Sequence, residues 1–144
     1  MTRVDFYVLA ERSTGDRYLL GCRLAEKAFT QGHQVLLNAT DRTEAEKLDR
    51  LLWTFRQQSF IPHGLVGTAD PALTPVLIGW NNRMPEVKED VLINLSPEVP
   101  AFFSRFDRVL EPIDGQPQLL EGGRARFRFY RDRGYPLQYH EIKL

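Results

Sequence analysis

A strand followed directly by a helix is encoded by residues 34–55, which read QVLLNATDRTEAEKLDRLLWTF. Residues 34–39 are apolar enough for a buried strand. Thr40 and Asp41 then supply side-chain oxygens that can cap the first turn of a helix. The large apolar side chains of this helix share one face, from which Trp53 is displaced: Leu48, Leu51, Leu52 and Phe55. The stretch therefore predicts a strand–helix unit with a core-facing stripe.

The same alternation of strand and helix recurs on both sides of this unit. Upstream, residues 4–10 predict a first strand, and residues 19–29 predict a helix that ends at Gly32. Downstream of an irregular loop, a short helix that is started by Ser96 and has Pro97 at its first position is predicted within residues 97–106. Three further strands are predicted, at residues 76–80, 91–95 and 108–112. This alternation favours an α/β fold, a Rossmann-like three-layer arrangement with a mostly parallel sheet.

Length, charge and cysteine content limit the class of protein. The chain has 144 residues, the usual size of one domain, and we expect a single domain over residues 1–144. Its 19 Lys and Arg balance 19 Asp and Glu, so the molecule as a whole cannot hold nucleic acid by bulk charge. Cys22 is the single cysteine, which excludes an internal disulfide and fits a reducing cytoplasm. No apolar run approaches the roughly 18 residues of a membrane helix, so we expect a cytoplasmic protein without a membrane span.

The sequence contains no motif for a cofactor, a metal ion or a catalytic group. Phosphate-binding turns need closely spaced glycines, and the turn after the first strand holds only Gly15 beside two acidic residues. The histidines, His33, His63 and His140, lack the spacing of metal ligands. Cys22 falls among apolar helix positions, where a buried thiol is more frequent than a catalytic one. We therefore expect no cofactor, no metal ion and no catalytic residues.

Large apolar side chains are concentrated after the second helix, within nine residues: Trp53, Phe55, Phe60 and Ile61. One interpretation is a loop that folds back over the core. The other is an exposed aromatic patch for a protein partner, because aromatic residues dominate interface anchors. In the second interpretation Trp53 and Phe60 share the patch, and Pro62 and His63 shape the loop beside them.

Positive charge is concentrated in residues 123–133, which hold five arginines and one acidic residue. If this segment is a helix, four residues lie on one face: Arg124, Phe127, Arg128 and Arg131. They would form a cationic pocket with an apolar floor, which suits an acidic ligand. If the segment is a strand, arginines and aromatic residues alternate between two faces, as in an ordinary half-buried strand. A solvated basic face and a strip for single-stranded nucleic acid are further interpretations.

Several segments, in order along the chain, resemble one known family. They are VDFYVL (4–9), GHQVLL (32–37), LD followed by LW (48–53), SFIPHGL (59–65) and VLINLS (91–96). Together they are similar to the chi subunit of bacterial DNA polymerase III, and the likeness is weakest after Pro112. The resemblance implies an α/β fold like that of nucleotide-binding domains but without a nucleotide. It also implies an accessory of the clamp loader rather than an enzyme.

The resemblance further implies two partner-binding surfaces. The first corresponds to Trp53 and Phe60, beside Pro62 and His63, and would bind the psi subunit of the clamp loader. Whether a helicase shares this surface stays open. The second would bind the acidic, Phe-terminated tail of single-stranded DNA-binding protein, so that contact with DNA is indirect.

The tail-binding surface corresponds to Arg124, Phe127 and Arg128, and the charge of Arg131 would attract acidic residues ahead of the terminal phenylalanine. The family often has tyrosine and lysine at the positions of Phe127 and Arg128, which preserves aromatic and cationic character. A glycine pair at residues 122–123 disfavours the helix by roughly 1 kcal/mol per glycine. Two other classes of function stay open: a small α/β nucleotide-binding or hydrolase domain, and a direct binder of single-stranded nucleic acid.

Overall fold

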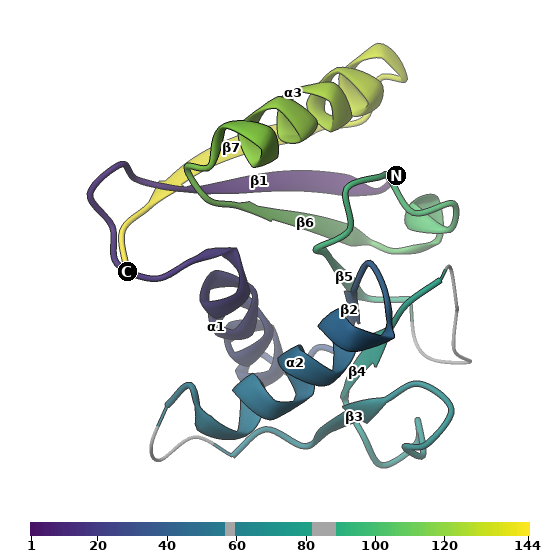
Figure 1. The fold of residues 1–144 in the computed structure, drawn as a ribbon. Helices are drawn as coiled ribbons and strands as arrows, with labels where there is room; N and C mark the ends of the chain where they lie inside the picture. The colour runs from purple at the N-terminus through teal and green to yellow at the C-terminus, as the bar shows by residue number, and fades with distance from the viewer. Residues whose placement is uncertain (57–59, 82–88) are drawn as a thin grey trace.

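The computed structural model describes residues 1–56, 60–81 and 89–144 (Figure 1). Ser59, which begins the SFIPHGL segment, lies outside the described residues. The helices are α1 (Arg17–Thr30), α2 (Arg42–Thr54) and α3 (Pro117–Asp132), with a 3₁₀ turn, η1 (Phe103–Arg105). The strands are β1 (Arg3–Leu9), β2 (Val35–Asn38), β3 (His63–Leu65), β4 (Val76–Gly79), β5 (Val91–Asn94), β6 (Arg108–Ile113) and β7 (Leu137–Ile142).

The described strands form one sheet in the order β3-β4-β2-β5-β6-β1-β7, and every pair of neighbours is parallel. Parallel strands require crossover connections, and α1, α2 and α3 lie in those from β1 to β2, from β2 to β3 and from β6 to β7. The prediction of an α/β fold with a mostly parallel sheet is therefore confirmed. The strands β3 and β7, which form the two edges of the sheet, were not among the predicted elements.

Two apolar layers lie on opposite faces of the sheet. Along β2, Val35 and Leu37 face the core formed with α1 and α2, whereas Leu36 faces the core formed with α3 and η1. Figure 1 shows α3 over the β6–β1–β7 end of the sheet. Because both faces are covered, the central strands β2, β4 and β5 each begin with three consecutive apolar residues, which made them recognisable in the sequence.

Side-chain caps fix the starts of the first two helices. Asp16 Oδ1 accepts a hydrogen bond from Leu19 N at 3.0 Å. Asp41 Oδ1 likewise accepts from Glu44 N at 2.9 Å, and Glu44 Oε1 reaches back to accept from Thr40 N at 2.8 Å. These bonds satisfy backbone amides that the first turn of a helix leaves without partners.

The short helix predicted within residues 97–106 is wrong, because only η1 is helical there. Ser96 does not act as its cap: the Ser96 hydroxyl lies 2.8 Å from the carbonyl oxygen of Glu98, an acceptor, instead of accepting from a helical amide. The segment contributes buried phenyl rings to the core instead: Phe102, Phe103 and Phe106. The sequence left residues 123–133 open between helix and strand. The structure shows that they form the second half of helix α3 and its C-terminal cap.

None of the helices in the described parts of the chain has the length and apolar character needed to cross a lipid bilayer.

Candidate functional site

The position where Rossmann-like folds bind nucleotides is occupied by carboxylates. This position lies beyond the carboxyl ends of β1 and β6, whose following helices go to opposite faces of the sheet. A crevice of about 370 Å³ there is lined by Glu11, Asp16 and Asp114. Asp114 Oδ2 accepts a hydrogen bond from Arg17 N at 3.2 Å, and the Asp16 side chain accepts one from Leu19 N. These two backbone amides at the start of α1 are the kind of donor that binds a phosphate in nucleotide-binding folds. The crevice therefore repels phosphate.

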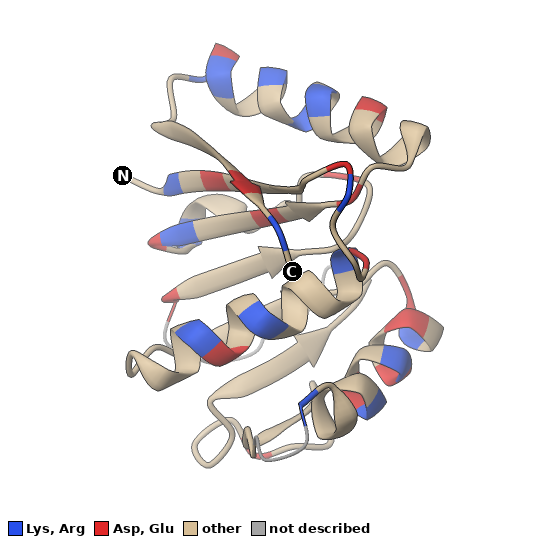
Figure 2. Cartoon of the chain, turned by 90° about the vertical axis from the view of Figure 1, so that its left-hand side faces the viewer, with Lys and Arg blue, Asp and Glu red and all other residues tan. Residues whose placement is uncertain are grey.

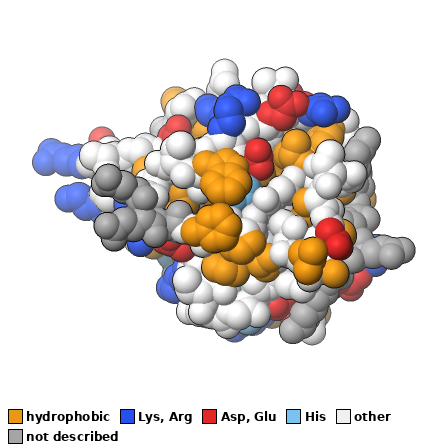
Figure 3. All heavy atoms as spheres, turned by 90° about the horizontal axis from the view of Figure 1, so that it is seen from below, with side chains coloured by type: hydrophobic (Ala, Val, Ile, Leu, Met, Phe, Trp, Pro, Cys, Tyr) orange, Lys and Arg blue, Asp and Glu red, His pale blue; other side chains and the backbone are white. Residues whose placement is uncertain are grey.

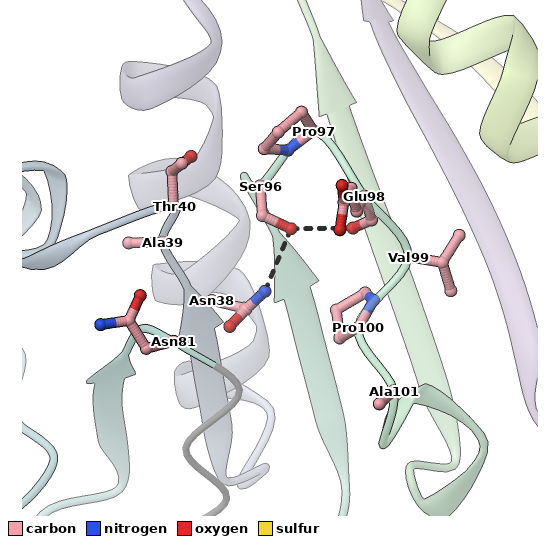
Figure 4. A pocket seen from close by; sticks show the side chains of 10 residues that line it. All are labelled: Asn38, Ala39, Thr40, Asn81, Ser96, Pro97, Glu98, Val99, Pro100 and Ala101. Carbon is pink, nitrogen blue, oxygen red and sulfur yellow. Dashed lines mark hydrogen bonds between the residues drawn. The ribbon is translucent and has the colours of Figure 1, made fainter.

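A second hollow, of about 440 Å³, lies at the carboxyl end of β2 (Figure 4). Asn38 lies in its wall and donates from Nδ2 to Ser96 Oγ at 3.2 Å. Its lining, among the described residues, carries the carboxylate of Glu98 and no lysine or arginine. A polar hollow of this kind has no cation to hold a phosphate.

Neither a metal centre nor a reactive thiol is found in the described part of the chain. No group of three or more His, Cys, Asp or Glu side chains within it is placed to hold a metal ion. Cys22 is fully buried, and burial raises the pKa of its thiol to about 12. A thiol in that state is uncharged at neutral pH and is a poor nucleophile.

The exposed part of the aromatic cluster after α2 consists of Trp53 and Phe60, which we name the aromatic patch. Their side chains are 55% and 68% exposed, and their ring centroids lie 5.8 Å apart. Ile61, in contrast, is buried, and Phe55 packs against the core from a half-buried position. Figure 3 shows hydrophobic side chains gathered on this face of the molecule, below α2 and β3. Part of the cluster thus folds over the core, whereas Trp53 and Phe60 are exposed.

Pro62 and His63 lie beside the aromatic patch, as the sequence predicted. The Pro62 carbonyl accepts from Val76 N at 3.3 Å and joins the loop to β4. The His63 ring lies 4.6 Å from the Trp53 ring, and its side chain is fully buried. These contacts fix the backbone that presents the patch.

Basic residues recur along α3 (Figure 2), but they do not form one surface. Arg124, Arg128 and Arg131 are exposed, and Arg131 pairs with its neighbour Asp132 at 3.1 Å. Arg126 instead points into the core. The helical arrangement predicted for the four candidate residues is therefore present, with one arginine of the segment withdrawn from the surface.

An apolar pocket of about 280 Å³, which we name the α3 pocket, opens beside the exposed arginines. Phe127 lies in its wall and packs edge-on against Phe6 with 5.3 Å between ring centroids, and Arg124 is also part of the lining. Arg128 and Arg131 are not among its lining residues. Leu120 and Tyr139 complete the pocket, and sequence reasoning missed both. Tyr139 could not be found because β7 itself was not predicted.

Arg126 belongs to a buried polar network that joins α3 to the sheet. Its Nε donates to Glu111 Oε1 at 2.9 Å, and Tyr130 and Asn94 donate to Glu111 Oε2 at 2.8 and 3.0 Å. Burial raises the pKa of Glu111, and the nearby Arg126 charge opposes that rise. The network satisfies the fully buried carboxylate and fixes the rotation of α3 about its axis.

The glycine pair of α3 is explained by close packing. A Cβ built on Gly123 would overlap Ile113 Cδ1, whereas one on Gly122 would lie 3.2 Å from the Nη1 atom of Arg126. Gly123 thus lets α3 approach β6 closely. The cost of glycine in a helix is offset by this approach, which also forms one wall of the α3 pocket.

Comparison with known proteins identifies the family of this chain. The sequence matches the protein family described as DNA polymerase III chi subunit, HolC, over residues 1–138. The chain belongs to this family. It is 44% identical over 142 residues to the chi subunit of DNA polymerase III from Pseudomonas aeruginosa, which covers 99% of this chain and 98% of that protein. It is 30% identical over 141 residues to the subunit from Escherichia coli, covering 95% and 96%.

The chi subunit from Haemophilus influenzae is 29% identical over 138 residues, 96% of each chain. Chi is an accessory subunit of DNA polymerase III rather than a catalytic one. As a member of the chi family, this chain takes part in DNA replication. In it, the aromatic patch lies beside α2 and β3, and the α3 pocket lies against β1, β6 and β7. The two surfaces are therefore at opposite ends of the sheet.

Proposed function

We propose that this chi-family chain is a non-catalytic adaptor of the polymerase III clamp loader in the cytoplasm. Its aromatic patch binds the psi subunit, and its α3 pocket binds the acidic, Phe-terminated tail of single-stranded DNA-binding protein. The observation that carries the proposal is the placement of two chemically different surfaces at opposite ends of one sheet. Two partners can bind at once without competing.

The α3 pocket has the chemistry that such a tail needs. A phenyl ring can enter the apolar space between Phe127, Leu120 and Tyr139, which contributes roughly 1.5–3 kcal/mol. Arg124 stands in the wall, so its guanidinium can bind the terminal carboxylate that follows the ring. Its present ion pair with Glu121, at 3.8 Å between exposed side chains, is weak enough to be replaced.

The remaining exposed arginines favour the acidic residues that precede the phenylalanine. Arg128 lies one turn along α3 from Arg124, outside the pocket lining. Arg131 lies further along and is engaged by Asp132, so we assign it a smaller share of the attraction. With one buried ring and one charge-assisted bond set against the entropy lost on association, the affinity is of micromolar order.

The aromatic patch suits a partner with an apolar contact surface. Trp53 and Phe60 are more exposed than large aromatic side chains normally are, and tryptophan is a frequent interface anchor. The buried His63 ring and the Pro62 backbone hold the patch in place before the partner arrives. A helicase with the same kind of apolar surface would compete with psi for it.

Calorimetric titration of the full chain tests the tail-binding half of the proposal. An acidic peptide ending in phenylalanine should bind with micromolar affinity that weakens as salt rises, because the arginines are exposed and screened. The same peptide without its last residue should not bind. If a single-stranded oligonucleotide binds and the peptide does not, the chain is a direct nucleic-acid binder. Unchanged peptide affinity in a double variant, Arg124→Ala with Arg128→Ala, would reject the site.

A further inference from the structure

The two edges of the sheet differ in how far their main-chain groups are already bonded. The edge at β3 is three residues long, and the Leu65 carbonyl at its end accepts from Thr68 N and Ala69 N at 3.2 and 3.0 Å within its own turn. The edge at β7 is six residues long, and all six are half-buried or exposed. The β7 edge is therefore the more open of the two.

The hydrogen bonds from β1 show which main-chain groups of β7 face outward. Backbone amides at the two ends of β1 donate to the carbonyl oxygens of Pro136 and Ile142, at 3.0 and 2.7 Å. Because alternate residues of a strand turn their main-chain groups to the same neighbour, the even-numbered residues of β7 face β1. The N–H and C=O groups of Leu137, Tyr139 and Glu141 therefore face away from the sheet, where an added strand would bond them.

This open edge is continuous with the α3 pocket. Tyr139 lies opposite Phe6 in the register of β1 and β7, and both side chains line the pocket. Leu137, two residues earlier, packs against the same core as α3. A chain whose terminal ring lies in the pocket therefore has its preceding residues beside the outward-facing groups of β7.

The charges around the edge favour an acidic chain and give it a direction. α3 and β7 run in opposite directions (Figure 1), so Arg128 and Arg131, both exposed, lie toward the start of β7. Glu141, which is also exposed, lies toward its other end. An acidic chain is attracted at the first end and repelled at the second. It therefore runs parallel to β7, with its carboxyl end at the pocket.

We propose that the acidic residues ahead of the terminal phenylalanine add to the sheet as an extra strand, parallel to β7. This inference rests on the proposed binding of the acidic tail at the α3 pocket. Main-chain bonds to Leu137 and Tyr139 hold the tail extended, the ring fills the pocket, and the arginines of α3 attract the carboxylates. Recognition then depends on the path of the tail as well as on its last residue.

A second copy of this chain fits the same edge less well. Two β7 strands paired antiparallel about Tyr139 would place both α3 helices on one face of the joined sheet. The exposed arginines of the two helices would then lie on the same side of the junction, and like charges oppose such pairing. An acidic strand meets the opposite charge at this position.

Backbone methylation of a synthetic peptide separates main-chain contacts from side-chain contacts. The probe is an acidic peptide ending in phenylalanine, methylated at one backbone nitrogen at a time ahead of the ring. Its affinity for the full chain should fall about ten-fold at every second position and change little at the positions between, because alternate N–H groups face away from β7. Equal affinity at all positions would overturn strand addition and leave the pocket proposal intact.

Amide hydrogen exchange of the full chain provides the second measurement. With the unmodified peptide bound, the Tyr139 amide should exchange at least about ten-fold more slowly, whereas the His140 amide, which faces β1, is the control and should not change. Unchanged exchange at Tyr139 would overturn the proposal. Protection that rises with the concentration of the chain alone would assign the edge to a second copy and overturn it as well. Absence of peptide binding would instead reject the proposed function.

Discussion

Arg124 and Arg126 are two positions apart on α3, yet their guanidinium groups lie in opposite environments. The Arg124 side chain is 66% exposed beside the α3 pocket, whereas Arg126 is buried with its Nε 2.9 Å from Glu111 Oε1. Two helix positions correspond to a rotation of about 200°, which sends one side chain to solvent and the other to the core. The arginine-rich segment thus provides a structural contact on one side of α3 and an exposed basic face on the other.

Arg126→Ala should destabilise the fold by about 3–5 kcal/mol, because Glu111 would remain buried without its cation. Burial raises the pKa of this carboxyl, so the neutral form is the one that tolerates burial. The penalty should therefore grow as pH rises and Glu111 loses its proton. Urea denaturation measures it, and Arg124→Ala, the exposed neighbour, should change stability by less than about 0.5 kcal/mol. Equal losses for both variants would contradict the assignment.

Trp53→Ala and Phe60→Ala should leave the melting temperature nearly unchanged, since both side chains are largely exposed. If the side chain anchors the interface, each substitution should weaken the free energy of binding to psi by about 2 kcal/mol or more. The loss is measured as reduced co-purification with psi. Ile61→Ala is the matched control, because this buried neighbour should lower stability by about 2–5 kcal/mol. Unfolding of the Trp53 variant would mean that the indole belongs to the core.

The two adjacent glycines of α3 should respond differently to alanine. Gly123→Ala should destabilise the protein, because its Cβ would overlap Ile113 on β6 and push the helix from the sheet. Gly122→Ala should destabilise the protein less, because its Cβ would lie 3.2 Å from Arg126 Nη1, which donates to the Pro97 carbonyl at 2.9 Å, and the helix preference of alanine offsets part of that crowding. Thermal melts of the two variants give the comparison, and the reverse order would disprove the packing explanation.

Cys22 should resist thiol reagents in the folded protein, because burial raises its pKa to about 12. In the unfolded chain the thiol has a pKa of about 8.5. Burial of the neutral thiol thus contributes stability that is complete below about pH 8.5 and declines as pH rises toward the folded value. Unfolding free energies of wild type and Cys22→Ala at several alkaline pH values should converge. Rapid labelling of the native protein at neutral pH would refute this.

The fold could be predicted because its central strands are buried on both faces. Consecutive apolar residues such as Val91, Leu92 and Ile93 of β5 are recognisable without knowledge of their neighbours. The edge strands gave no such pattern. β3 has three residues with Gly64 at its centre, and β7 alternates with polar positions such as Gln138, so only pairing with β4 and β1 makes them strands.

The candidate site could be predicted in part for a related reason. Helical spacing places Arg124, Phe127 and Arg128 near one another, but the sequence left helix and strand open for this segment, as it left core and exposed patch open for Trp53. The burial of Arg126 depends on Glu111, and the α3 pocket depends on Tyr139. Both contacts join residues that are distant in sequence, and the pattern of one helix contains no information about them.

Capture of single-stranded DNA-binding protein on immobilised psi tests the adaptor function most directly. The wild-type chain should link the two, so that the DNA-binding protein is retained only when the chain is present and its acidic tail is intact. The double variant Arg124→Ala with Arg128→Ala should still be retained by psi but should no longer retain the DNA-binding protein. Equal retention with the wild-type chain and the double variant, or without any chain, would contradict the assignment of the α3 pocket as the link.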